Sequence, residues 1–495
     1  MSMESEKSEG SRFAINRVIG SKLANNTVKK GIIISFSTLL VIYLGMSLYF
    51  INHFYFGSKV NGVNISGKTV KQADDLITSQ TESYSLNIKE RGDKEEQINA
   101  ADVGLKSDST DKIQELKDSQ KPFAWIVAPF INQDAELTGI VSLDETKLNS
   151  TLDKLNCLIS KNIVSPQNAK LSYTEEGYKI VDEVYGNKIN KDSFYSLVKK
   201  TILNEEPEID LDKANCYENP KFTTNSQQVV DAKETANKYL VSQITYTFGD
   251  KNEVLDKATI HNWISVNDNF EIVLNESKIK DYINTLDDKY GTVGKARDFK
   301  TSSGETKKVG AYVQMNGANK ADPDEFYGWS ISTSKETKDL IENIKNGQSV
   351  TKEPKYAKQA KSHGANDIGN TYVEISLSKQ HLWFYKNGSL VVDGNVVTGN
   401  VAGSTETPPG VYKIKYKESP STLKGNNADG TKYAEPVEYW MPFNSGIGIH
   451  DLTKRNAFGG NIYLTNGSHG CVNSPLNLAQ KVYENIEAGT PVVVY

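Results

Sequence analysis

The sequence is poor in cysteine and carries no excess of positive charge. Three cysteines, Cys157, Cys216 and Cys471, occur among 495 residues, and this small odd number excludes a scaffold built from disulfides. Cys157 and Cys216 either pair with each other or lie buried as small apolar side chains, and Cys471 stays free in both cases. The net charge of −5 argues against the concentrated basic surface that nucleic-acid binding needs, so we expect no nucleic-acid partner.

Charged residues are also absent from one long run near the start of the chain. No Asp, Glu, Lys or Arg occurs between Lys30 and Lys59, and the apolar residues 31–56 exceed the ~20 that a membrane-spanning helix needs. A cleaved signal peptide and a buried core helix are the alternatives. The run ends in bulky aromatic residues, which favour an anchor with interfacial rings over a cleavage site. We therefore predict a single transmembrane helix over residues 31–56.

The basic residues around this run predict its orientation. Lys22, Lys29 and Lys30 precede it, with Arg12 and Arg17 further back. Only His53 and Lys59 follow it closely. Basic residues favour the cytoplasmic side of a membrane, so residues 1–30 are predicted to be a cytoplasmic tail and everything after Phe56 to lie outside. Most of the protein, and its substrate, is then expected on the outer face of the membrane.

The middle of the chain contains two similar halves. Residues 141–158 resemble residues 272–290, because both combine a short strand, an Asn or Asp turn and a helical pattern. Residues 185–209 resemble residues 327–350, since both begin with Tyr-Gly and continue into an amphipathic helix. We therefore predict two copies of one α+β module.

The predicted domain boundaries follow from changes in composition. The two modules are assigned to residues 57–215 and 216–350. Residues 351–370 are polar, contain Pro and Gly, and are predicted to form a linker. Residues 371–495 contain short strand patterns separated by turn residues, which is typical of an all-β sandwich or barrel. The expected fold is thus multidomain, with one transmembrane helix, two α+β modules and a mostly-β C-terminal domain.

A reactive cysteine is the strongest candidate for chemistry in that last domain. His450 ends a Gly-rich apolar stretch, and Cys471 follows 21 residues later within the sequence GSHGCVNSP (467–475). A nearby imidazole can activate a thiol, and Gly470 permits a tight turn that aims backbone N–H groups at an oxyanion. The spacing alone leaves two alternatives open, a structural loop and a zinc site formed by His450, His469 and Cys471.

Several motifs in this domain together resemble a known family. His450, followed by Ser468-His469-Gly470-Cys471-Val472-Asn473, is similar to the signature of the L,D-transpeptidase (YkuD-type) catalytic domain. The stretches QHLWFYKNGSLV, TGN followed by TPPG, and MPFNSGIGIHD occur in the family's order. The resemblance covers residues 371–495. The duplicated middle resembles the peptidoglycan-binding modules that are often joined to this domain in Gram-positive bacteria.

The resemblance implies a role for each matching residue. Cys471 would be the nucleophile, His450 the proton acceptor and donor, and the backbone carbonyl of Asp451 the group that orients His450. The backbone N–H groups of Gly470 and Cys471 would form the oxyanion hole, which His469 would line. The remaining matches would contact substrate: Ser445, Gly446, Ser468 and Asn473. Asp451 stands where relatives commonly have Ser, which leaves a role for its side chain open.

The resemblance also implies a reaction on the outer face of the membrane. The thiol would form a thioester with the third residue of a peptidoglycan stem tetrapeptide, release D-Ala, and pass the acyl group to another stem as a 3→3 cross-link. With water as the acceptor, the product would be that of an L,D-carboxypeptidase. No metal or organic cofactor is implied, and carbapenem-type β-lactams would acylate Cys471. The rival predictions are a non-catalytic scaffold that binds stem peptides and glycan strands, and a cysteine peptidase acting on protein.

Overall fold

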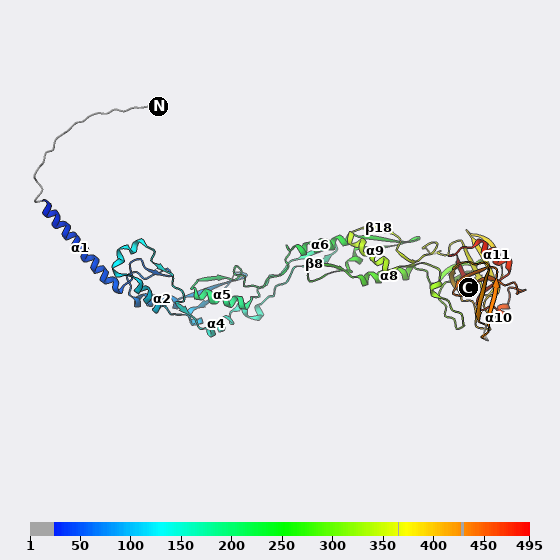
Figure 1. Cartoon of the computed structure of the whole chain (residues 1–495), viewed down its shortest axis with the longest axis horizontal. Coiled ribbons are helices and arrows are strands. Elements are labelled where there is room, and N and C mark those ends of the chain that lie inside the picture. Colours follow the sequence, from blue (N-terminus) through cyan, green and yellow to red (C-terminus); the bar gives the residue numbers. More distant parts are fainter. Residues whose placement is uncertain (1–23, 365, 427–429) are drawn as a thin grey trace, which may run out of the picture. The chain divides into compact units, whose positions relative to one another are not determined.

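The structure is a computed structural model that describes residues 24–364, 366–426 and 430–495. The chain forms two compact units. Unit 1 comprises Met1–Asn168 and Glu183–Lys221, and unit 2 comprises Ala169–Asp182 and Phe222–Tyr495. Figure 1 follows the helices and strands along the chain. Most of the predicted cytoplasmic tail, including Arg12, Arg17 and Lys22, lies outside the described residues.

Unit 1 starts with a long apolar helix, α1 (Ala24–Asn52). Its Val28–Asn52 portion is long and apolar enough to cross a membrane, and no other helix in the described part of the chain meets that standard. Most of its apolar side chains are exposed, with Phe36 at 72%. Phe50, Phe54 and Tyr55, predicted to be interfacial rings, are instead buried in unit 1, because they pack against its own apolar side chains.

The rest of unit 1 alternates short strands with helices. Its elements are β1 (Lys59–Val60), β2 (Val63–Asn64), α2 (Val70–Glu82), β3 (Ser85–Glu90), β4 (Lys94–Asn99), η1 (Ala100–Val103), β5 (Lys106–Ser107), α3 (Thr110–Ser119), η2 (Pro122–Phe130), β6 (Asp134–Ala135), β7 (Val141–Ser142), α4 (Glu145–Leu152), η3 (Asn156–Leu158), η4 (Ser160–Asn162), α5 (Lys191–Leu203) and β10 (Glu208–Asp210). Its core includes Leu86 and Ile88 of β3 and Phe194 and Val198 of α5.

The first half of unit 2 is again α+β. Its elements are β8 (Lys170–Thr174), β9 (Gly177–Val181), α6 (Gln227–Leu240), β11 (Gln243–Phe248), β12 (Lys251–Leu255), α7 (Lys257–His261), β13 (Ile264–Val266), β14 (Ile272–Leu274), α8 (Glu276–Tyr290), β15 (Arg297–Lys300), β16 (Thr306–Val309), η5 (Pro323–Glu325), β17 (Ser330–Ile331), α9 (Thr333–Asn346), β18 (Ser349–Lys352) and β19 (Tyr356–Lys358). Its core includes Ile244 and Tyr246 of β11 and Leu340 of α9.

The two α+β halves share one order of elements. In unit 1 the order is α2, β3, β4, α4, α5 and β10, and in unit 2 it is α6, β11, β12, α8, α9 and β18. In each half the first strand pairs antiparallel with the second and parallel with the last. Equivalent helices also begin alike, since the side chains of Asp144 and Asn275 accept backbone N–H groups in the first turns of α4 and α8.

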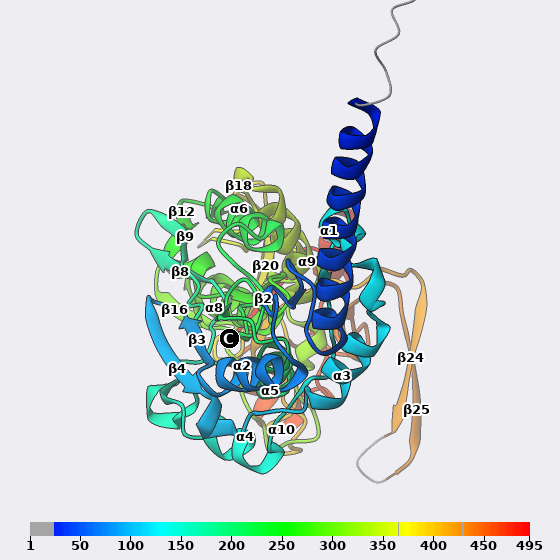
Figure 2. The same ribbon diagram turned by 90° about the vertical axis from the view of Figure 1, so that its left-hand side faces the viewer.

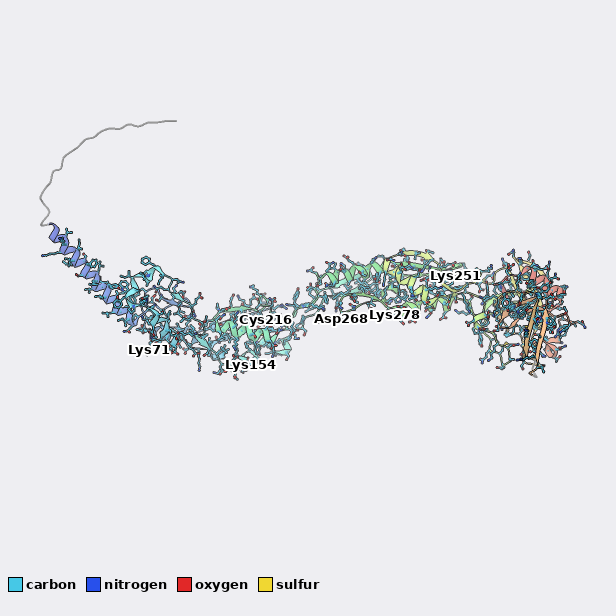
Figure 3. All side chains as sticks on the ribbon, in the orientation of Figure 1. Lys71, Lys154, Cys216, Lys251, Asp268 and Lys278 are labelled. Atoms are coloured by element: carbon cyan, nitrogen blue, oxygen red, sulfur yellow. The ribbon has the colours of Figure 1, made fainter. Side chains whose placement is uncertain are left out.

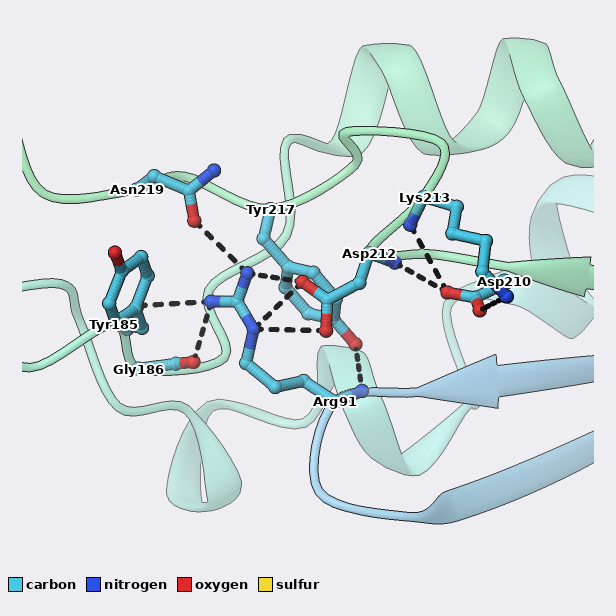
Figure 4. Close-up of polar contacts among 8 residues, drawn as sticks. All are labelled: Arg91, Tyr185, Gly186, Asp210, Asp212, Lys213, Tyr217 and Asn219. Carbon is cyan, nitrogen blue, oxygen red and sulfur yellow. Dashed lines mark hydrogen bonds and ion pairs between the residues drawn. The ribbon is translucent and has the colours of Figure 1, made fainter.

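One arginine holds the β3–β4 turn of unit 1 in place (Figure 4). Arg91 forms an ion pair with Asp212 at 2.5 Å and donates to the carbonyl oxygens of Tyr185 and Gly186 at 3.2 and 3.0 Å. Its backbone N–H donates to the Tyr217 hydroxyl at 2.8 Å, and its guanidinium lies 4.3 Å from the centre of that ring. A single side chain therefore joins the hairpin to two later segments of the unit.

Two segments lie elsewhere in the fold than predicted. The β8–β9 hairpin, assigned to the first module, belongs to unit 2, where Asn237 of α6 accepts the Tyr178 N–H at 2.8 Å. Residues 351–370, predicted as a linker, contribute to β18 and β19. Within them Asp367 is fully buried and pairs with Arg297 of β15 at 2.9 Å. The polar composition of this segment therefore reflects strand pairing and a buried ion pair.

The C-terminal half of unit 2 consists mainly of strands. Its elements are β20 (Tyr372–Ser376), β21 (His381–Lys386), β22 (Ser389–Asn395), β23 (Gly410–Lys413), β24 (Ser421–Asn426), β25 (Lys432–Val437), β26 (Trp440–Asn444), β27 (Ile447–Asp451), α10 (Ile462–Asn466), β28 (Val472–Ser474), α11 (Leu476–Asn485) and β29 (Pro491–Val494). A five-stranded sheet, β22-β21-β20-β29-β23, and a three-stranded sheet, β26-β27-β28, share one core. The long hairpin β24–β25 is drawn in orange in Figure 2.

The cysteines of unit 1 are free thiols. Cys157 and Cys216 are both buried and unpaired (Cys216 is labelled in Figure 3). They therefore serve as small apolar side chains, the second of the two predicted possibilities. Cys471 is also free and is only partly buried.

Candidate active site

Two parallel strands bring the predicted nucleophile and base together. β27 ends in His450-Asp451, and β28 begins at Val472, directly after Cys471. The strands pair with His450 opposite Asn473 and Ile449 opposite Val472. Adjacent strands lie about 4.8 Å apart and alternate residues share a face, so His450 and Cys471 emerge on the same side of neighbouring strands. Both side chains line one cavity of about 250 Å³.

His450 is held as a neutral imidazole with a defined tautomer. Only 4% of the residue is exposed, and burial lowers its pKa below the usual 6.5. Its Nδ1 lies 2.7 Å from the backbone carbonyl oxygen of Asp451, so Nδ1–H donates there. The lone pair then resides on Nε2, the ring nitrogen left to act as a base.

The Cys471 thiol is protonated at neutral pH. Burial raises its pKa to about 11, although the backbone N–H of Gly448 acts in the opposite direction. Its Sγ lies 3.7 Å from the carbonyl oxygen of Gly446, which accepts the thiol proton. A thiol in this state needs a base at the moment of attack, because the thiolate is the nucleophile.

The side chain of Asp451 stabilises the backbone around β26 and β27. It is 2% exposed, and its Oδ1 accepts the backbone N–H groups of Glu438 and Tyr439 at 2.9 and 2.8 Å. These bonds tie the start of β26 to the end of β27. The carboxylate therefore fixes the backbone whose carbonyl oxygen accepts the hydrogen bond from the His450 imidazole.

The loop before Cys471 is braced by Ser468. The Ser468 hydroxyl donates to the Cys471 carbonyl oxygen at 2.5 Å and accepts the Gly470 N–H at 3.0 Å. In this state the Gly470 N–H is already bonded within the loop. His469 is exposed, and its ring stacks on Tyr433 of β25 with centroids 5.1 Å apart. The structure thus brings His469 to the mouth of the cavity and keeps its ring on Tyr433.

The predicted substrate-binding residues fall into two groups. Asn473 is 4% exposed and lines the cavity together with Ser468. Ser445 and Gly446 form the β26–β27 turn at the exposed edge of the site. Ser445 adopts a φ of +47°, and its hydroxyl donates to Asp322 at 3.3 Å.

A residue outside the predicted catalytic domain also reaches this loop. The Asn319 Nδ2 donates to the carbonyl oxygens of Thr405 at 2.8 Å, Glu406 at 3.1 Å and His469 at 2.9 Å. Gly470 has a φ of +123°, and a Cβ placed on it would lie 2.4 Å from the same nitrogen. Only glycine fits here, and Asn319 holds the peptide next to Cys471. Nothing in the sequence distinguishes Asn319 from its neighbours, because these contacts span up to 150 residues.

The segment that carries Asn319 is anchored on the same domain. The Asp322 N–H donates to Asn444 Oδ1 at 2.9 Å, and Asn444 Nδ2 donates to the Lys320 carbonyl oxygen at 3.0 Å. Glu325 forms an ion pair with Lys415 at 2.6 Å. These bonds run along the edge of the site beside Ser445.

The cavity also contains a cation that sequence reasoning did not identify. Arg455 lines it beside His450, and burial lowers the Arg455 pKa from its ordinary value. Its Nε is buried without a hydrogen-bond partner among the described residues. Glu435 and Tyr433 of β25 form the wall near it. The cavity can therefore offer a positive charge to a carboxylate close to the thiol.

Comparisons with known proteins identify the family. Residues 370–494 match the family described as "L,D-transpeptidase catalytic domain" (YkuD). Residues 96–210 match the family described as "Putative peptidoglycan binding domain". A search of curated proteins gave no match.

Solved structures of two relatives can be compared with the chain. A crystal structure of an Enterococcus faecium L,D-transpeptidase with its cysteine changed to serine is 31% identical over 55% of this chain and 100% of that one, with a TM-score of 0.45. The solution structure of the Enterococcus faecium catalytic domain is 43% identical over 26% of this chain and 97% of that one, with a TM-score of 0.24. From the match over residues 370–494 and from these identities, the chain belongs to the L,D-transpeptidases.

Proposed function

We propose that this L,D-transpeptidase forms 3→3 cross-links between peptidoglycan stem peptides through a thioester on Cys471. The observation that carries the proposal is the pairing of β27 with β28, where a neutral, oriented imidazole adjoins a thiol that is protonated at neutral pH. Such a pair performs acyl transfer only if the base takes the thiol proton as the sulfur attacks.

The first half-reaction consumes the donor stem. His450 Nε2 takes the thiol proton while Sγ attacks the carbonyl carbon between the third residue and the terminal D-Ala. The resulting oxyanion lies against the Gly470–Cys471 backbone, where the Cys471 N–H, and the Gly470 N–H once it leaves Ser468, donate to it. The tetrahedral adduct collapses as His450 returns the proton to the D-Ala nitrogen. Free D-Ala departs and the thioester remains.

The second half-reaction uses the same groups in reverse. An amine of an acceptor stem attacks the thioester, and His450 accepts its proton. The C–S bond then breaks, the new amide forms the cross-link, and the sulfur regains a proton. Arg455 supports donor binding, because its charge suits a carboxylate of the anionic stem. Asn473, Ser445 and Gly446 are the further expected contacts with substrate.

The anchoring part of the proposal concerns α1. We propose that α1 crosses the membrane once, with the N-terminus in the cytoplasm and the catalytic domain on the wall face. The packing of Phe50 and Tyr55 with Ala128 supports an anchor that stays attached, because a cleaved signal peptide would not be part of the folded core. Lys29 and Lys30 at the start of the helix support the orientation.

The α+β halves are proposed to contact the wall. The match of residues 96–210 supports peptidoglycan as the partner of the first half, and the shared order of elements supports a second copy in residues 216–350. Inhibition by carbapenems through Cys471 is proposed because the Enterococcus faecium catalytic domain, 43% identical, is described as acylated by ertapenem.

Product analysis tests the function. The full chain in detergent is incubated with disaccharide-tetrapeptide muropeptides, and the products are followed by mass spectrometry. We expect D-Ala release and a cross-linked dimer, both abolished in Cys471→Ala. D-Ala release without a dimer would identify an L,D-carboxypeptidase. No release from either protein, with binding to sacculi retained, would make the protein a scaffold, and cleavage of a protein substrate alone would make it a peptidase.

The Arg455 assignment has its own test on the same substrates. Arg455→Gln should raise the KM for the tetrapeptide donor while the acylation rate by a carbapenem changes less. Lys454→Gln, at an exposed neighbouring lysine, is the control. An unchanged KM in Arg455→Gln would exclude its role in donor binding.

A further inference from the structure

A short apolar segment of unit 1 lies uncovered beside α1. Residues 122–131 comprise η2 and Ile131, and no charged residue occurs between Lys121 and Asp134. The segment exposes five large apolar side chains: Phe123 at 57%, Ile126 at 52%, Val127 at 54%, Phe130 at 86% and Ile131 at 60%. Monomeric proteins in water rarely gather so many apolar side chains on one short exposed stretch, and such patches mark interaction surfaces.

The segment is fixed against the second half of α1. The Tyr43 hydroxyl donates to the Phe123 carbonyl oxygen at 2.8 Å, and the Tyr43 ring stacks on Trp125 with centroids 6.2 Å apart. Two turns further along α1, Phe50 lies 6.0 Å from Trp125 and packs with Ala128. Figure 2 shows this part of the chain, in cyan, next to the lower turns of α1. These contacts prevent the segment from turning its exposed side chains inward.

The position of these contacts along α1 determines the depth at which residues 122–131 would lie in a bilayer. Tyr43 precedes Asn52, the last residue of α1, by nine residues, which is about 13 Å at 1.5 Å per residue. The hydrocarbon core of a bilayer is about 30 Å thick. If α1 crosses the bilayer, the segment beside its last turns therefore reaches the outer interfacial layer of the same bilayer.

The chemistry of the segment suits that layer. Trp and Tyr are enriched where headgroups meet acyl chains, and interfacial helices bury an apolar face that carries Trp, Phe and Leu there by about 5–10 Å. Its backbone is partly bonded within itself, since Ala124 N–H donates to the Lys121 carbonyl and Ile131 N–H to the Ala128 carbonyl. A 3-10 helix still leaves backbone groups unpaired, which favours the wet interface over the bilayer centre. Exposed Lys121 stands at the start of the segment, next to where phosphates would lie.

We propose that residues 122–131 form a second membrane contact, inserted into the outer interfacial layer of the bilayer that α1 crosses. The occupant of this surface is lipid, and its function is to hold unit 1 against the membrane beside the anchor. This inference rests on the proposed anchoring by α1. Because the segment and α1 are contacted separately by lipid, one experiment can distinguish the failure of either.

Photo-crosslinking to lipid tests both contacts at once. The full chain is reconstituted into phosphatidylcholine vesicles that carry a diazirine-labelled phospholipid, and the adducts are mapped by mass spectrometry. We expect adducts within residues 31–52 and within residues 122–131. Adducts in 31–52 with none in 122–131 would overturn the inference and leave the anchor standing. Adducts in neither range would refute the anchor, and the inference with it.

A fluorescence measurement gives an independent readout on the folded protein. Brominated phosphatidylcholine quenches tryptophans that lie in the membrane, and the difference between the wild type and Trp125→Phe isolates the Trp125 signal. We expect a quenchable Trp125 component that falls in Phe130→Asp, at a side chain too exposed to be needed for folding. Leu390→Asp, at an exposed apolar residue of β22, should leave it unchanged. A Trp125 signal insensitive to brominated lipid would overturn the proposal.

Discussion

Asn319 offers the sharpest test of how the active-site loop is held. Its amide donates to three carbonyl oxygens, those of Thr405, Glu406 and His469, and it closes off the space beside Gly470. Asn319→Ala removes all three bonds but deletes no group expected to touch substrate. The loop that carries Cys471 should then sample conformations in which its N–H groups no longer face the oxyanion.

The expected loss of activity in Asn319→Ala depends on how exposed these three hydrogen bonds are. A neutral hydrogen bond contributes about 0.5–1.5 kcal/mol net. The bonds to Thr405 and Glu406 are partly buried, whereas the bond to His469 is exposed and is replaced more easily by water. We therefore expect a loss of about 1–2 kcal/mol in transition-state stabilisation, equivalent to about a 5- to 30-fold decrease in kcat/KM.

The assay compares acylation with unfolding. The rate of Cys471 acylation by a carbapenem and the D-Ala release rate are measured for wild type, Asn319→Ala and Asn316→Ala, which alters an exposed asparagine of the same segment. Asn316→Ala should match the wild type. The positioning argument is refuted if Asn319→Ala keeps wild-type rates, or if its loss of rate equals the loss of folded protein measured by thermal unfolding.

Three further predictions follow from the site and the fold. His450→Ala should abolish acylation, whereas His469→Ala should retain most of it and mainly raise KM, as measured by mass spectrometry of the acyl-enzyme. The acylation rate should be constant from pH 6.5 to 9.0 and fall only below pH 6.5, because the reactive imidazole must be neutral and burial lowers the His450 pKa; a decline that begins above pH 6.5 would contradict this. Arg91→Ala should weaken hydrogen-exchange protection in β3 and β10 by about 2–3 kcal/mol, because several acceptors lose a partly buried charged donor at once, while Lys89→Ala, at an exposed ion pair, should cost clearly less.

Local sequence patterns were sufficient to predict that His450 and Cys471 lie together. His450 and Cys471 lie in short motifs directly before or within strands, and the parallel pairing of β27 with β28 brings the two motifs together. The carbonyl of Asp451 lies where the resemblance implied, because the group is one residue from His450. The contacts of the Asp451 side chain were not visible in the motif, since they depend on the turn before β26.

Long-range contacts account for what sequence reasoning missed. Residues 351–370 were predicted to be a linker because they are polar. The partner of Asp367 is Arg297, 70 residues away, so the buried ion pair was not visible in the local sequence. The β8–β9 hairpin was assigned to the first module because its partner, α6, lies beyond the predicted boundary. Asn319 and Arg455 have no local signature at all. Their importance arises only from the cavity and loop that the folded chain builds around them.

The pairing of first and last strands has a mechanical consequence. β3 runs parallel to its neighbour β10, and β11 to its neighbour β18. When the two ends of such an α+β half are pulled apart, its parallel first and last strands are drawn in opposite directions. The hydrogen bonds between these two strands are then loaded together in shear and do not open one at a time. If α1 anchors the chain and Cys471 is bonded to the wall, as proposed, tension between these two points runs through both α+β halves for as long as the acyl-enzyme lasts. Strand order thus lets each α+β half resist tension along the chain.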